Sequence, residues 1–124
     1  MGSEDIWIIG SNMTKFGKHP EKDVVDLASE ASVAALRDAE MTMSDIGVLG
    51  VGNLMNAGAG IGQQLQKQIG QTGVPVFNVS NACATGATAQ ELAQALGLYH
   101  HHFCGGACYQ RRSDCWAQGY GAHG

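Results

Sequence analysis

The sequence is poor in charged residues and in proline. Only 15% of its 124 residues are charged, against about 25% in typical globular proteins, and it contains two prolines. The formal net charge is −4, and the one adjacent basic pair is Arg111–Arg112. A nucleic-acid-binding surface needs clustered lysine and arginine to neutralise phosphates, so no nucleic-acid partner is expected. The scarcity of proline argues against a proline-rich disordered chain.

Long apolar runs and a basic N-terminal start are also missing. No run approaches the ~20 residues of a membrane-spanning helix, and Met1–Ile6 lacks the lysine or arginine that opens a secretory signal. These features predict a cytoplasmic protein without a membrane span. In a reducing compartment the four cysteines are expected to be free, catalytic or metal-bound rather than paired in disulfides.

Apolar residues and glycine are abundant. Hydrophobic residues make up 44% of the chain, and its 18 glycines follow no repeat period. Between Ile46 and Gln90 the single charged residue is Lys67. Charged side chains are depleted at the centres of subunit interfaces, so we expect this segment to lie inside a layered fold or under a second subunit.

Hydrophobic periodicity predicts alternating strands and helices. Short apolar runs indicate buried strands, and apolar residues at intervals of three and four indicate helices. The predicted strands are residues 6–9, 46–51 and 74–79, and the predicted helices are residues 23–39, 61–69 and a third that continues to about residue 97. This order yields a parallel sheet covered by helices. The predicted fold class is α/β with a parallel-rich sheet.

Cys83 stands between a predicted strand and the start of the third helix. Small residues surround it, which would let a bulky substrate approach the sulfur. The unpaired N–H groups and partial positive charge of a helix N-terminus favour thiolate over thiol. Spacing alone leaves an alternative open, because free cysteine is often a small apolar residue packed in the core.

Four segments in one order resemble a known family. Val79–Gly86 resembles the nucleophile motif of the thiolase superfamily, and Gly10–Phe16 resembles the opening of the sterol-carrier-protein-X and lipid-transfer-protein type of thiolase. Asp26–Ala31 is similar to that family's first helix, and Thr72–Val76 to its approach to the nucleophile strand. The resemblance predicts that residues 1–89 form a partial N-terminal thiolase-like domain, an incomplete βαβαβα half of the family's layered fold.

The resemblance implies that Cys83 is an acyl-accepting nucleophile. It would take an acyl group from coenzyme A as a thioester and pass it on in a Claisen condensation or its reverse, in fatty-acid or sterol side-chain metabolism. Acyl-CoA is the implied substrate, and no metal is expected. The family's other catalytic groups lie in downstream parts that this chain does not match, so we expect little or no turnover from the chain alone. In thiolases the uncharged segment includes a strand that pairs across a dimer, which implies a homo-oligomer or docking with a thiolase subunit.

Residues 90–124 depart from the family pattern. We expect the helix to continue to about residue 97 and an irregular, divergent tail to follow, of the kind that a frameshift or truncation would leave. The tail holds potential zinc ligands, but their spacing does not favour a site; they are His100, His101, His102, Cys104, Cys108, Cys115 and His123. Cys104 and His19 superficially match the family's second cysteine and histidine motifs but stand in the wrong context.

Two classes of function stay open from the sequence. The first is a thiolase-like acyl-CoA acyltransferase that uses Cys83. The second is a non-catalytic thiolase-fold fragment that binds an acyl chain or assembles with another subunit, as the uncharged segment suggests. A ketoacyl synthase also attaches acyl groups to a cysteine at a strand-to-helix turn, but the resemblances of Gly10–Phe16 and Asp26–Ala31 argue against it.

Overall fold

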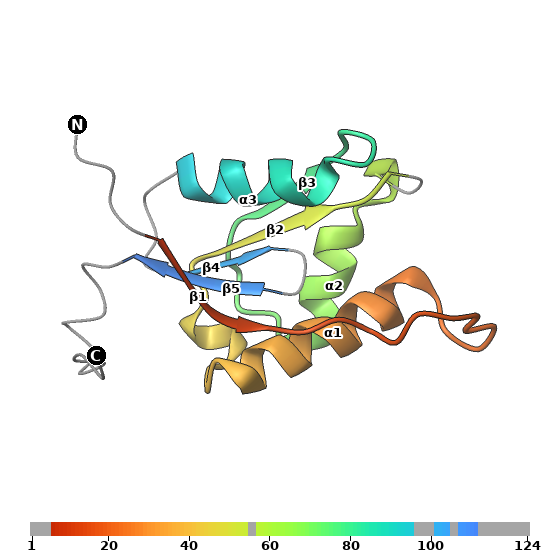
Figure 1. Cartoon of the computed structure of the whole chain (residues 1–124), viewed down its shortest axis with the longest axis horizontal. Helices are drawn as coiled ribbons and strands as arrows, with labels where there is room; N and C mark the ends of the chain where they lie inside the picture. Colours follow the sequence, from red (N-terminus) through yellow and green to blue (C-terminus); the bar gives the residue numbers. More distant parts are fainter. Residues whose placement is uncertain (1–5, 55–56, 96–100, 105–106, 112–124) are drawn as a thin grey trace.

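A computed structural model describes residues 6–54, 57–95, 101–104 and 107–111 of the chain (Figure 1). The strands are β1 (Ile6–Ser11), β2 (Val48–Gly52), β3 (Val76–Val79), β4 (His101–Cys104) and β5 (Ala107–Arg111). The α-helices are α1 (Val24–Asp38), α2 (Ile61–Ile69) and α3 (Thr85–Ala95), and two short 3-10 helices are η1 (Met43–Asp45) and η2 (Ala57–Ala59). The three strands and three helices predicted up to residue 95 are therefore present.

The strands form one mixed sheet in the order β1-β5-β4-β2-β3. β2 pairs in parallel with both β3 and β4, whereas β5 is antiparallel to β4 and to β1. β1, β2, β3 and β4 thus share one direction and β5 runs against them. The α/β class with a parallel-rich sheet is confirmed, and the carboxyl ends of β1, β2 and β3 meet at one edge.

The helices cover both faces of the sheet. α3 packs on β2, β3 and β4 on one face, and α1 and α2 pack together on the other (Figure 1). β2 divides its side chains between the two layers, because successive residues of a strand point to opposite faces. Leu49 and Val51 belong to the core under α1 and α2, while Val48 packs against Ala89 and Ala93 of α3. This central strand is therefore covered on both sides.

Two glycines permit close approach between layers. A Cβ atom at Gly10 would lie 2.5 Å from the carbonyl oxygen of Ala35, so β1 and α1 could not pack as they do with a larger residue. A Cβ atom at Gly62 would collide with Val76 and Asn78 of β3. The Gly62 N–H instead donates to Oδ1 of Asn78 at 2.7 Å, which fixes the first turn of α2 to the sheet.

The segment after α3 differs from the sequence expectation. We predicted an irregular tail beyond residue 97, whereas the structure contains β4 and β5 there. Pairing with β1 and β2 supplies partners for the backbone groups of these strands, and such long-range partners leave no periodic signal in so short a segment. The helix ends at Ala95 among the described residues, and residues 96–100 and 112–124 lie outside them. The predicted boundary near residue 89 stays a prediction.

None of the described helices has the length and apolar character needed to cross a membrane.

Candidate active site

Cys83 lies in the turn that joins β3 to α3. β3 ends at Val79 and α3 begins at Thr85. Between them the Ala84 N–H donates to the carbonyl oxygen of Asn81 at 3.0 Å, which closes a tight turn around Cys83. The cysteine is exposed. The alternative of a core-packed cysteine is therefore wrong, and the sulfur is open to reagents.

The residue before the cysteine has an uncommon backbone conformation. Ala82 has φ = 46°, in the left-handed region that residues other than glycine rarely adopt. Such a conformation costs of order 1–3 kcal/mol and persists where surrounding contacts impose it. The turn that presents Cys83 is thus held by specific interactions rather than by local preference.

The hydroxyl of Thr85 supplies those interactions. Its Oγ1 accepts the Asn81 N–H at 2.8 Å and donates to the carbonyl oxygen of Ala82 at 2.7 Å. Thr85 is only 7% exposed, and both hydrogen bonds are partly buried. The hydroxyl therefore clamps the two residues that precede Cys83.

A second contact joins the turn to the first turn of α3. The Asn81 side chain donates from Nδ2 to Oγ1 of Thr88 at 2.9 Å, and Thr88 donates to the carbonyl oxygen of Ala84 at 3.1 Å. The N–H groups at the start of α3 carry partial positive charge, which favours a negative group at the end of this turn. The turn therefore presents the exposed Cys83 side chain next to the N-terminus of α3.

Open space lies beside the cysteine. A Cβ atom added to Gly86 would meet no other atom within 4 Å, and Ala82 and Ala84 are exposed. By contrast, a Cβ atom at Gly52, at the end of β2, would collide with Thr85. Glycine at position 52 therefore lets α3 approach the sheet, while the small residues around Cys83 leave its outer side accessible.

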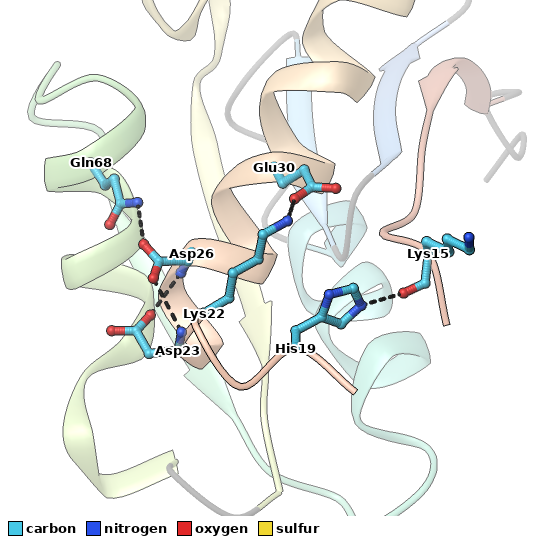
Figure 2. A network of polar contacts seen from close by, with 7 residues as sticks. All are labelled: Lys15, His19, Lys22, Asp23, Asp26, Glu30 and Gln68. Atoms are coloured by element: carbon cyan, nitrogen blue, oxygen red, sulfur yellow. Dashed lines mark hydrogen bonds and ion pairs between the residues drawn. The ribbon is translucent and has the colours of Figure 1, made fainter. Parts of the chain in front are cut away.

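His19, which superficially matches the family's histidine motif, makes a contact within its own loop. Figure 2 shows His19 in the loop between β1 and α1, where its Nε2 lies 2.8 Å from the carbonyl oxygen of Lys15. That carbonyl can only accept, so the ring nitrogen donates. His19 thus braces its own loop.

The same view shows how α1 begins and how it contacts α2. Asp23 and Asp26 form a reciprocal capping box: the Asp26 N–H donates to Asp23 at 2.8 Å and the Asp23 N–H donates to Asp26 at 3.1 Å (Figure 2). Gln68 of α2 donates to the same Asp26 carboxylate at 3.1 Å. The hydrogen bond from the Asp23 backbone, with that from Gln68, lowers the pKa of Asp26 below its ordinary value. Lys22 pairs with Glu30, and this hydrogen bond raises the pKa of Lys22.

Among the described residues, no group of histidine, cysteine, aspartate and glutamate side chains is placed to hold a metal ion. Of the tail residues considered above, His100, Cys115 and His123 lie outside the described residues, and for Cys104 and Cys108 the structure describes the backbone of β4 and β5.

The sequence analysis identified neither the hydrogen bonds of Thr85 nor the left-handed conformation of Ala82. A threonine two positions after Cys83 at a helix start was a usable signal, because threonine hydroxyls commonly bond to nearby backbone groups there. The left-handed conformation of Ala82 had no such signal, since alanine gives no hint of a positive φ.

Comparison with curated proteins finds relatives over most of the chain, although no protein-family model matches it. Non-specific lipid-transfer protein-like 2 of Caenorhabditis elegans is 40% identical over 94 residues, which cover 73% of this chain and 23% of that protein. Sterol carrier protein 2 of Homo sapiens is 36% identical over 94 residues, 73% of this chain and 17% of the relative. An acetyl-CoA acetyltransferase of Methanocaldococcus jannaschii is 37% identical over 97 residues, which cover 74% of this chain and 24% of that protein. The chain spans about a quarter or less of the length of these relatives.

Solved structures show the same fold. The 3-oxoacyl-(acyl-carrier-protein) synthase III of Aquifex aeolicus superposes with a TM-score of 0.59 at 21% identity, over 66% of this chain and 28% of that one. An OleA variant of Xanthomonas campestris gives a TM-score of 0.60 at 20% identity, over 67% of this chain and 26% of that one. At this identity the likeness shows that the chain shares the α/β fold of these two proteins. In sequence it resembles, more particularly, the sterol-carrier and lipid-transfer type together with acetyl-CoA acetyltransferase, as the four segments predicted.

Proposed function

We propose that this chain is a thiolase-type acyl-accepting unit and that Cys83 is its nucleophile. The observation that carries the proposal is an exposed cysteine at the N-terminus of α3, on a turn clamped by the Thr85 hydroxyl. The relatives named as acetyl-CoA acetyltransferase and lipid-transfer protein support an acyl thioester as the substrate class. The proposed setting is the cytoplasm.

The proposed step is a transfer between two sulfur atoms. The Cys83 thiolate attacks the carbonyl carbon of the acyl-CoA thioester, a new C–S bond forms, and the bond between the carbonyl carbon and the coenzyme A sulfur breaks. Coenzyme A leaves as a thiolate and takes up the proton that Cys83 released. Because the chain matches only about a quarter or less of its relatives' length, we expect a slow first half-reaction and no measurable catalytic cycle from the chain alone.

Incubation with acetyl-CoA and mass spectrometry of the digested chain tests the proposal. An acetyl group should appear on the peptide that contains Cys83, hydroxylamine should remove it as expected for a thioester, and Cys83→Ser should abolish it. Iodoacetamide should also label Cys83 in preference to the other cysteines. Acetylation or alkylation dominated by Cys104, Cys108 and Cys115 would sink the proposal.

A second candidate is a non-catalytic assembly module. Its support is the edge strand β3, which pairs with β2 on one side within the described sheet and contains no charged residue. Unprotected edges of this kind readily pair with a second chain, and charged residues are the common defence against it. This candidate function requires the chain to self-associate, or to join a thiolase subunit, through β3.

A further inference from the structure

The loop between β1 and α1 carries the most exposed large apolar side chain that the structure describes. Phe16 is 88% exposed, and Met13 in the same loop is 66% exposed. The loop extends past the start of α1 at one end of the molecule's long axis (Figure 1). An aromatic side chain that stays in water forgoes the free energy of burial, so its exposure at the end of a projecting loop indicates an interaction surface.

The base of this loop is fixed to the body of the protein. The Ser11 N–H donates to the carboxylate of Asp38 in α1 at 2.9 Å. The next three residues, 12–14, form part of the wall of a cavity of about 310 Å³, together with a half-buried apolar stripe of α1 that includes Leu27 and Ala31. The part of the loop that projects therefore begins at Lys15.

A hydrogen bond closes the projecting tip. The ring of His19 donates to the carbonyl oxygen of Lys15 at 2.8 Å. Between these two residues Gly17 has φ = 152°, and a Cβ atom there would meet no other atom within 4 Å. Phe16 and Lys18 are thus displayed on a closed turn, which reduces the conformational entropy that binding would cost.

The charge of the tip is opposite to that of the chain. Residues 12–20 contain Lys15 and Lys18 and no aspartate or glutamate, whereas the whole chain has a formal net charge of −4. Both lysines are exposed, and among the described residues neither has a carboxylate partner, since the ion pair of this region joins Lys22 to Glu30. Figure 2 shows the Lys15 side chain directed away from Glu30. Two unneutralised positive charges therefore flank Phe16.

An exposed aromatic side chain between two lysines matches the surface of an anionic lipid bilayer. Aromatic rings favour the region of the lipid headgroups, and each lysine near an anionic bilayer strengthens binding about fivefold. Lysine stems can lie along apolar material while their ammonium groups stay at the headgroups. A protein partner would need a preformed pocket for a projecting ring, whereas a bilayer admits the ring without one.

We propose that the loop between β1 and α1 is a docking surface for anionic lipid membranes. Phe16 enters the headgroup region, and Lys15 and Lys18 contact the anionic groups of the lipids. The loop follows β1 and the Cys83 turn follows β3, so both lie at the carboxyl edge of the sheet. Docking therefore turns the edge that carries Cys83 toward the bilayer. The proposal goes beyond acyl transfer and does not depend on it.

Sedimentation of the full chain with lipid vesicles tests the proposal. The chain should bind vesicles of phosphatidylcholine and phosphatidylserine at least about tenfold more tightly than vesicles of phosphatidylcholine alone, because two lysines contribute about fivefold each. Raising the salt concentration from about 0.1 M to 1 M should release the chain, since the Debye length falls from about 10 Å to about 3 Å.

Substitutions in the tip separate its two contributions. Lys15→Gln and Lys18→Gln should each weaken binding to the anionic vesicles about fivefold. Phe16→Ala should weaken it at least about fivefold through loss of apolar burial, and Phe16→Trp should keep it, because indole also favours the interface. Lys67→Gln and Leu92→Ser are the matched controls, at an exposed lysine of α2 and an exposed leucine of α3, and should leave binding unchanged.

Circular dichroism of each variant shows whether it folds. Absence of vesicle binding, equal binding to neutral and anionic vesicles, or equal loss in the tip and control variants would overturn the proposal. A change of oligomeric mass in Phe16→Ala without vesicle binding would assign the loop to a protein contact and would overturn it as well. Vesicle binding and acetylation of Cys83 are measured separately, so either proposal can fail while the other holds.

Discussion

At the scale of single residues, the backbone conformation that presents Cys83 depends on the hydroxyl of Thr85. Cys83 is exposed, and the hydrogen-bonded turn of Asn81 and Ala82 before it sets its position. That backbone includes a left-handed alanine, Ala82, whose cost is offset by the two hydrogen bonds of Thr85. Cys83 therefore supplies the thiol, and the side chain of Thr85 holds the backbone that positions it.

Replacing Thr85 with valine tests this division. Thr85→Val keeps the shape but removes the acceptor of the Asn81 N–H and one of the two donors to the Ala82 carbonyl oxygen, so the free energy of unfolding should fall by about 0.5–1.5 kcal/mol. Release of the turn should also slow alkylation of Cys83 by iodoacetamide about two- to fivefold, the factor equivalent to the 0.3–1 kcal/mol of a charge at a helix N-terminus.

Thr85→Ser restores the hydroxyl and should restore the alkylation rate, which loss of packing alone would not do. Thr72→Val, at an exposed threonine in the loop before β3, is the control and should change neither quantity. An unchanged rate in Thr85→Val, measured while the protein is folded, would show that the clamp does not position the cysteine.

At the scale of elements, helix ends join the layers of the fold. Asp26 closes the first turn of α1 and also accepts a hydrogen bond from Gln68, so one carboxylate links α1 to α2. Asn78 of β3 holds the first turn of α2 in the same manner. These contacts tie α1 to α2 and α2 to the sheet, and they could not be predicted from the periodicity that indicated each helix separately.

The lowered pKa of Asp26 predicts a pH-dependent contribution to stability. A carboxyl whose pKa is depressed in the folded state stabilises it above the unfolded pKa, about 3.9 for aspartate, and this contribution is lost as the pH falls through the folded value. Urea unfolding should show that Asp26→Asn destabilises the chain at pH 7 and that the difference from the unchanged protein shrinks between about pH 5 and pH 2.5. Glu91→Gln, at an exposed carboxylate of α3, should show a smaller pH dependence. A constant difference across that range would contradict the assignment.

At the scale of the whole molecule, the uncharged segment has two distinct environments. Its central part, β2, is buried between the helix layers, as a layered interior requires. Its later part, β3, is half-buried and forms an edge of the sheet. The low charge of the sequence therefore reflects both an interior and an edge that a further chain can cover.

The edge predicts self-association. In light scattering coupled to gel filtration, the apparent mass of the chain should rise with concentration through the micromolar range. Thr72→Lys and Ser80→Lys introduce charge at exposed positions on either side of β3 and should shift the chain to monomer, because lysines block edge-to-edge pairing. Ala95→Lys, exposed at the end of α3, should leave association unchanged. A monomer at all concentrations would remove the basis of the assembly function.

The sequence by itself determined the order and type of the elements up to residue 95, the α/β class and the position of Cys83 between a strand and a helix. These depend on periodicity and chain neighbours, which are local. Only the tertiary structure decided the strand order β1-β5-β4-β2-β3, the pairing of β4 and β5, the left-handed Ala82 and the cavity beside α1. The strand order and the cavity arise from contacts between residues distant in the chain, whereas Ala82 is held by a side chain three residues away whose hydrogen bonds leave no periodic signal. The apolar stripe of α1 illustrates the difference, because its spacing identified a helix but did not reveal which of its apolar residues would fill the core and which would leave a space.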